Sequence, residues 1–151
     1  MLGPLVDATG ALVLGLALLV AGVAAWWLRT RSGAVRTTGA GVSELEVLRS
    51  LGVRPEDADL TVVQFATAFC APCRATKARL EQLRTSHPGL AAVHVDAESQ
   101  LEAVRALDVR RTPTLFYLDR SGALLGRSSG APRPDELRAL VAAHAPATGA
   151  V

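Results

Sequence analysis

Residues 60–74, LTVVQFATAFCAPCR, join an apolar, β-branched run to two cysteines that are separated by two residues. The run over 60–65 predicts a buried strand, and the apolar spacing from Cys70 to about Ser86 predicts a helix. Cys70 and Cys73 therefore fall where a strand ends and a helix begins. The first turn of a helix has unpaired N–H groups and the positive end of the helix dipole, and both lower the energy of a thiolate.

This position predicts different roles for the two cysteines. Cys70, at the exposed helix start, is expected to be the attacking thiolate. Cys73, one turn further in, is expected to resolve the mixed disulfide. Pro72 suits the first helical turn because its missing N–H would have no partner there. The sequence thus predicts a redox-active disulfide between Cys70 and Cys73.

Two other roles for the cysteines are disfavoured. A zinc site needs four ligands, but there is no second cysteine pair, and the three histidines are scattered through the chain, at His87, His94 and His144. Two inert cysteines by chance would not explain the strand–helix context. We therefore predict no metal and no other cofactor, and we assign the histidines and Tyr117 to structure.

Apolar residues at the spacing of helices or strands predict the remaining elements. Strands are expected over 90–95, 114–118 and 123–127, and helices over 99–108 and from Pro134 onward. A short helix before the first strand begins with Ser43 as N-cap, in a capping box with Glu46, and ends at Gly52. The order α-β-α-β-α-β-β-α predicts an α/β fold. Its early alternation indicates parallel strands with crossover helices, and its late hairpin, turning at 119–122, adds an antiparallel edge.

The N-terminal part predicts a membrane anchor. Residues 8–28 carry no charge, and a helix of that length spans roughly the 30 Å of a bilayer core. Trp26 and Trp27 end it as an aromatic belt, before Arg29 and Arg31. A cleaved signal peptide is the alternative, but a basic region before the apolar core is missing.

These signals give the expected organisation of the chain. One N-terminal transmembrane anchor covers 1–29, a flexible Gly-rich linker 30–42, a folded domain 43–145 and a disordered tail 146–151. Because the arginines follow the helix, the positive-inside rule favours a single-pass protein with its domain in the cytoplasm. An extracytoplasmic domain is the alternative.

Charge excludes one class of partner. The net charge is +2, and Asp7 with the three arginines at 29, 31 and 36 accounts for all of it. The domain is therefore electrically neutral, which argues against nucleic-acid binding.

The chain resembles the thioredoxin family from about residue 43 to 145. Three motifs carry the resemblance: Cys70-Ala71-Pro72-Cys73, Arg111-Thr112-Pro113-Thr114, which is similar to the family's cis-proline loop, and Gly130 after the hairpin. The resemblance implies a thioredoxin-like three-layer fold, with a mixed central sheet of about four strands flanked by helices. It also implies a monomeric protein-disulfide oxidoreductase acting on protein thiols and disulfides, with an unidentified thiol electron donor. The implied substrate groove consists of Phe69, Ala71, Pro72, Thr112 and Pro113, with Pro113 shaping it and Thr112 pairing with the partner's main chain.

Five positions depart from the family pattern. Phe69 replaces a tryptophan, Ala71 a glycine, and Ala78 the proline that kinks the long helix. Gln64 stands where many thioredoxins bury an aspartate, and Ala92 where they place its lysine partner. Because an amide cannot accept a proton as a carboxylate does, deprotonation of Cys73 is expected to use water or a substrate group.

The arginines near the pair allow two interpretations. Arg74, Arg110 and Arg111 could form a cationic rim that steers acidic partners, but solvated surface is the favoured interpretation.

Three functions are consistent with these signals. The leading hypothesis is reduction or exchange of protein disulfides at the cytoplasmic membrane face. The second is an extracytoplasmic reductase of selected exported or cytochrome-precursor cysteines. The third is a non-catalytic module that docks a membrane partner.

Overall fold

The computed structural model describes residues 12–24 and 42–146. The chain divides into two compact units, Met1–Arg31 and Ser32–Val151, which we treat separately. The predicted tail from 147 onward and nearly all of the predicted linker lie outside the described residues, as does part of the predicted anchor.

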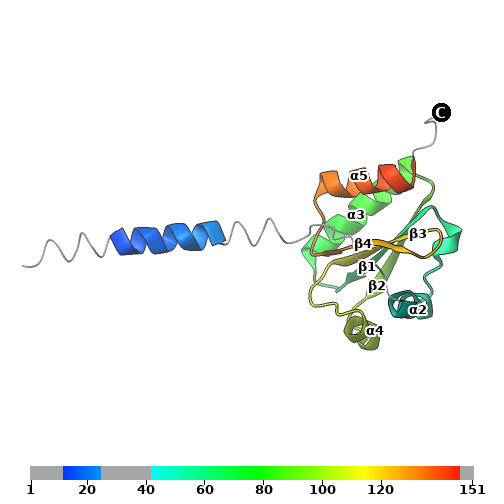
Figure 1. Cartoon of the computed structure of the whole chain (residues 1–151), viewed down its shortest axis with the longest axis horizontal. Helices are drawn as coiled ribbons and strands as arrows, with labels where there is room; N and C mark the ends of the chain where they lie inside the picture. The colour runs from blue at the N-terminus through cyan, green and yellow to red at the C-terminus, as the bar shows by residue number, and fades with distance from the viewer. Residues whose placement is uncertain (1–11, 25–41, 147–151) are drawn as a thin grey trace, which may run out of the picture. The chain divides into compact units, whose positions relative to one another are not determined.

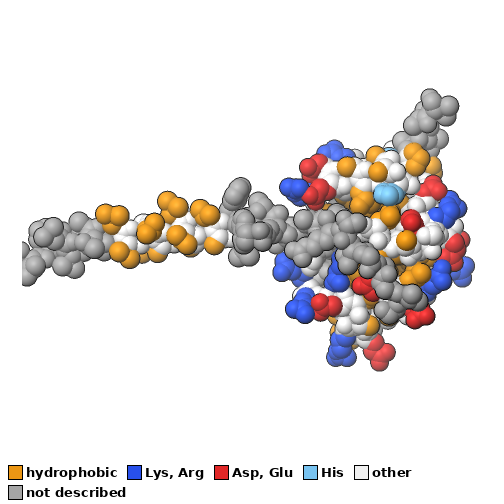
Figure 2. Space-filling model, in the orientation of Figure 1, with side chains coloured by type: hydrophobic (Ala, Val, Ile, Leu, Met, Phe, Trp, Pro, Cys, Tyr) orange, Lys and Arg blue, Asp and Glu red, His pale blue; other side chains and the backbone are white. Residues whose placement is uncertain are grey.

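The first unit contains one described helix, over residues 12–24. Its large apolar side chains are all more than half exposed, and Figure 2 shows them along the helix: Leu12, Val13, Leu14, Leu16, Leu18, Leu19, Val20 and Val23. Among the described residues, no helix combines the length and the apolar character required to cross a bilayer.

The second unit is a three-layer α/β fold (Figure 1). Its sheet has the strand order β2-β1-β3-β4, with α3 and α5 on one face and α2 and α4 on the other. In chain order the elements are α2 (Val42–Ser50), η1 (Pro55–Asp57), β1 (Leu60–Ala66), α3 (Ala71–Ser86), β2 (Leu90–Asp96), α4 (Leu101–Ala106), β3 (Thr114–Asp119), β4 (Leu124–Ser129) and α5 (Pro134–His144). The thioredoxin-like fold with a mixed four-stranded sheet flanked by helices is confirmed.

Side-chain alternation along β1 explains the two cores. Leu60 and Val62 pack in a cluster with Leu80 of α3 and residues of α5, whereas Val63 and Phe65 pack in a cluster with residues of α2 and α4. Successive strand residues point to opposite faces, so a continuous apolar run fills both layers. By the same alternation Gln64 faces α3, which places it beneath the cysteine pair.

Two sequence-based expectations need correction, and one element was missed. Helix α2 begins at Val42, so Ser43 lies inside its first turn and is not the N-cap. Only β1 and β2 are parallel, because β3 runs antiparallel to β1 as well as to β4. The short helix η1 was not predicted, since three residues carry no measurable period.

Local signals position the other boundaries. Gly52 has φ of +83°, as a helix-ending glycine does, and Gly122 has φ of +87° in the predicted turn between β3 and β4. Helix α3 continues without interruption through Ala78, where the family places a proline. It therefore presents one unbroken 16-residue helix whose first turn carries the cysteines.

Candidate redox site

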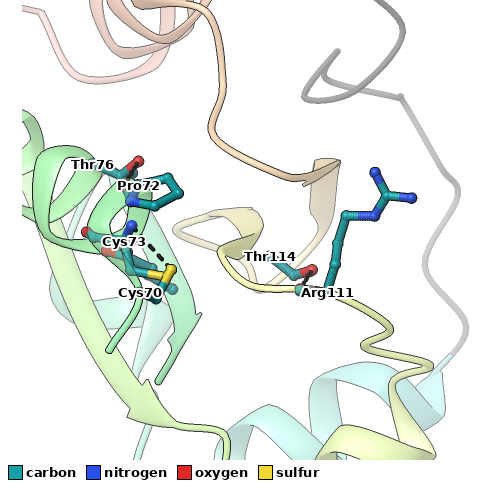
Figure 3. The surroundings of a disulfide bond; sticks show 7 residues. Cys70, Pro72, Cys73, Thr76, Arg111 and Thr114 are labelled. Atoms are coloured by element: carbon teal, nitrogen blue, oxygen red, sulfur yellow. Dashed lines mark hydrogen bonds between the residues drawn. A yellow bond between two sulfur atoms is a disulfide. The ribbon is translucent and has the colours of Figure 1, made fainter. Parts of the chain in front are cut away.

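Cys70 and Cys73 form a disulfide in the structure, with their Cα atoms 5.2 Å apart (Figure 3). Cys70 is half-buried, whereas Cys73 is only 3% exposed. The two sulfurs are therefore within bonding reach, and the outer one belongs to Cys70. This is the geometry that the spacing of the two residues predicts.

A backbone donor of α3 points at the outer sulfur. Cys70 is the N-cap residue of α3, and its Sγ accepts a hydrogen bond from the backbone N–H of Cys73 at 3.2 Å. The next turn is reinforced by Thr76, whose Oγ1 donates to the carbonyl oxygen of Pro72 at 2.9 Å. A sulfur in this place meets a backbone N–H and the positive end of a 16-residue helix, which favours its anionic form.

Gln64 ties β1 to the start of α3. It is 1% exposed, and its Nε2 donates to the carbonyl oxygen of Cys73 at 2.9 Å. Sequence analysis predicted a buried Gln64 but not this bond, because the two residues are nine positions apart and lie on different elements. The bond holds the inner cysteine against the sheet.

The loop before β3 has the backbone that the resemblance implies. The peptide bond between Thr112 and Pro113 is cis. Pro113 is buried and its carbonyl oxygen accepts from the N–H of Gly130 at 2.7 Å, while Thr112 is partly exposed. Thr114 closes the loop by donating from Oγ1 to the carbonyl oxygen of Arg111 at 2.7 Å.

Exposed apolar groups lie beside the disulfide. Phe69 is 94% exposed, and Ala71 and Pro72 are also exposed. Because these side chains are exposed, they add little to the stability of the fold. An exposed aromatic ring here suits contact with another molecule.

The nearby arginines have separate surroundings. Arg110 forms an ion pair with Asp108, at 2.8 Å between Nε and Oδ1. Figure 3 shows the Arg111 side chain pointing away from the disulfide. Arg74 is exposed and lines the mouth of a cavity next to Cys73.

That cavity has a volume of about 310 Å³ and was not predicted. Its walls come from the ends of β1 and β2 and from the first turns of α3. No sequence signal marks such a space, because it exists only where three elements meet.

A disulfide-forming pair at the start of a helix, inside this α/β fold, defines the chain as a thiol–disulfide oxidoreductase with a thioredoxin-like fold. Comparisons with known proteins agree. The thioredoxin family model matches residues 53–143, and the chain belongs to the thioredoxin family.

Relatives and solved structures support this membership. The chain is 32% identical to Thioredoxin H-type of Fagopyrum esculentum over 89 residues, which cover 59% of this chain and 75% of the relative. It is 29% identical to Thioredoxin H4-1 of Oryza sativa subsp. japonica over 90 residues, which cover 60% of this chain and 67% of the relative. The structure of Fasciola hepatica thioredoxin superposes with a TM-score of 0.54 and 29% identity, covering 64% of this chain and 90% of that one.

Family and cysteine pair together assign the activity. Thioredoxins act on protein thiols and disulfides, and this chain is a protein-disulfide oxidoreductase.

Proposed function

We propose that this protein reduces or exchanges disulfides of other proteins while tethered to the cell membrane, with Cys70 as nucleophile and Cys73 as resolving thiol. The observation that carries the assignment of roles is the hydrogen bond from the Cys73 N–H to the Cys70 sulfur, combined with the burial of Cys73. The outer sulfur accepts a hydrogen bond from a helix N–H, and the inner sulfur is shielded from partners.

The reaction then has two steps. The Cys70 thiolate attacks a partner disulfide, and one partner sulfur leaves with the bonding electron pair. Cys73 next attacks the Cys70 sulfur, so that the Cys70–Cys73 bond forms and the second partner sulfur leaves. The partner disulfide is reduced, and the two cysteines of this chain are oxidised.

The substrate groove in this proposal surrounds the outer sulfur. Phe69, Ala71 and Pro72 supply apolar contact, and Pro113 shapes the opposite side. Thr112 is partly exposed, so its backbone groups can pair with an extended partner segment. Support comes from the exposure of the first three residues, which do not contribute to the core.

Insulin reduction by the full chain in detergent micelles tests the activity. With dithiothreitol as donor, we expect turnover by the wild type and none by Cys70→Ser. Cys73→Ser should instead accumulate a mixed disulfide. A folded wild-type chain with free thiols but no turnover would contradict the proposal, and unchanged function in cells after Cys70→Ser would point to docking without catalysis.

The proposed tether is residues 1–29, in a single pass. Its support is the charge-free stretch over 8–28 and the exposed apolar side chains of the helix over 12–24. The arginines at 29, 31 and 36 follow this stretch, so we place the oxidoreductase domain on the cytoplasmic side.

Orientation is decided by labelling intact cells. A cysteine placed at Gly39, in a chain with Cys70→Ser and Cys73→Ser, should resist a membrane-impermeant maleimide until the cells are opened. Labelling of intact cells would place the domain outside the cytoplasm. The second hypothesis, an extracytoplasmic reductase of selected exported cysteines, would then replace the first.

The physiological partner can be identified by capturing it as a stable mixed disulfide. Cys73→Ser in cells is expected to hold partners on Cys70 as mixed disulfides, and Cys70→Ser with Cys73→Ser is the matched control. The captured proteins would identify both the substrate and its compartment.

A further inference from the structure

The cavity beside Cys73 brings an imidazole to the same space as the inner sulfur. Besides Cys73, its walls include Gln64 of β1, His94 and Asp96 of β2, and Lys77 of α3. Gln64 and His94 are register partners on adjacent parallel strands, so their side chains lie next to each other on the α3 face. Gln64 stands where many thioredoxins bury an aspartate, and its amide cannot accept a proton as a carboxylate does. Its neighbour His94, however, is a base.

Two polar atoms at this place are buried without a hydrogen-bond partner among the described residues. They are Oε1 of Gln64 and Nε2 of His94. Gln64 uses its amide N–H₂ on the Cys73 carbonyl, which leaves the carbonyl end of the amide as an acceptor. Buried polar atoms in folded proteins are paired, commonly by ordered water, and a cavity of about 310 Å³ has room for several water molecules.

His94 is uncharged at neutral pH, so its ring has a nitrogen that can accept a proton. Burial lowers its pKa below the usual 6.5, and the charge of Lys77 and, more weakly, of Arg84 act in the same direction, whereas Glu81 opposes them. Glu81 lies on α3, which covers this face of the sheet, and its Oε1 is 3.6 Å from Nε2 of His94. Asp96 and Arg74 are the other charged groups on the cavity wall.

Resting on the role proposed above for Cys73, we propose that His94 accepts the Cys73 proton through water held in the cavity beside Gln64. Nε2, the buried ring nitrogen without a hydrogen-bond partner in the described part of the chain, is the basic nitrogen, and the Glu81 carboxylate 3.6 Å from it stabilises the protonated ring. His94 is thus a positioning residue that acts through water, and Gln64 fixes that water with its Oε1.

Protons and electrons balance in this step. The Cys73 S–H proton moves through water to His94, and the Cys73 thiolate attacks the Cys70 sulfur of the mixed disulfide. The Cys70–Cys73 bond forms, the bond to the partner breaks, and the partner sulfur leaves with the electron pair. It takes a proton from solvent, and His94 returns its own proton to solvent through the cavity.

Two-phase kinetics test the relay on the full chain in detergent micelles. An aromatic disulfide reagent that releases a coloured thiolate gives one release when Cys70 attacks and a second when Cys73 resolves. His94→Gln should slow the second phase by about 10- to 100-fold near pH 7 and leave the first phase within about twofold. As the pH rises and hydroxide can take the Cys73 proton directly, the rates of the two chains should converge.

The control is His144→Gln, which removes an exposed histidine of α5 and should leave both phases unchanged. Imidazole added to His94→Ala should restore the second phase below about pH 8 and have no effect on the wild type. A second phase that is unchanged by His94→Gln, or slowed equally at every pH, would overturn the relay. A wild-type chain without a first phase would instead contradict the proposed function.

Discussion

Cys70 is the residue on which the chemistry depends, and a backbone N–H stabilises its sulfur. The N–H of Cys73 points at its sulfur from 3.2 Å, and no side-chain base is required to favour the anion. Sequence analysis could predict this arrangement, because a cysteine that immediately precedes a helix has few other places for its side chain. It could not predict the amide bond from Gln64, whose partner is a carbonyl oxygen on a separate element.

The first prediction concerns the acidity of this thiol. In Cys73→Ser, which leaves one cysteine, the alkylation rate of Cys70 should reach half its maximum at a pH below the about 8.5 of free cysteine. The N–H of Cys73 and the positive end of the helix dipole are the physical reason. The measurement is the iodoacetamide rate against pH, and a midpoint at or above that of a free thiol would contradict the account.

Phe69 gives a second prediction at the residue scale. It is 94% exposed, so Phe69→Ser should change the free energy of unfolding by no more than about 0.5 kcal/mol. Insulin reduction should fall several-fold, while reduction of a small aromatic disulfide stays the same. Leu101→Ser, which removes an apolar side chain that is 52% exposed on α4, is the matched control and should affect neither reaction. Equal losses on both substrates would show that Phe69 does not contact protein partners.

At the scale of elements, periodicity located strands and helices to within a few residues but could not give their direction. The apolar run over 114–118 predicts a buried strand, yet nothing in it distinguishes parallel from antiparallel pairing with β1. Contacts between distant elements could not be predicted from the sequence either. Arg127 of β4 lies with its guanidinium carbon 4.9 Å from the centre of the Phe116 ring and donates to the carbonyl oxygens of Leu107 and Asp108, and no local pattern indicates that role.

The hairpin between β3 and β4 depends on one carboxylate, which gives a third prediction. Oδ1 of Asp119 accepts from the N–H of Ser121 at 2.9 Å and from the N–H of Ala123 at 2.9 Å. Asp119→Ala should therefore lower the free energy of unfolding by about 1–2 kcal/mol. Urea unfolding of the fragment 32–151 measures this, with Asp57→Ala as an exposed control.

The same variant has a predictable pH dependence. Hydrogen bonds to Ser121 and to the turn backbone lower the pKa of Asp119 in the folded protein. The stabilisation that the Asp119 carboxylate provides is therefore complete above its unfolded-state pKa of about 3.9. It is lost as the pH falls through its folded-state pKa. The difference between wild type and Asp119→Ala should shrink between about pH 5 and about pH 2, and a constant difference would contradict this role.

Across the whole molecule, one sheet with two covered faces accounts for the oxidoreductase domain, and the N-terminal segment is a separate unit. The cores could be predicted because β1 is apolar at consecutive positions, and a strand of that kind needs cover on both sides. The cavity could not, since its walls come from residues as far apart as Gln64 and Asp96.

The fourth prediction tests the tether. The full chain should stay with membranes after carbonate extraction, whereas the fragment 32–151 should be released. Leu16→Arg with Leu19→Arg should release the full chain, because each arginine near the centre of a membrane helix costs about 2.5–3.5 kcal/mol. Exchange of the same two leucines for valine is the control. Release of the wild-type chain by carbonate would contradict anchoring by residues 1–29.

The amide of Gln64 has one more consequence. A carboxamide neither gains nor loses a proton anywhere between an acidified vesicle and an alkaline organelle. Its hydrogen bond to the Cys73 carbonyl is therefore the same in every compartment, so this link between β1 and α3 does not respond to acidity, whereas the cysteine thiols and the His94 imidazole do.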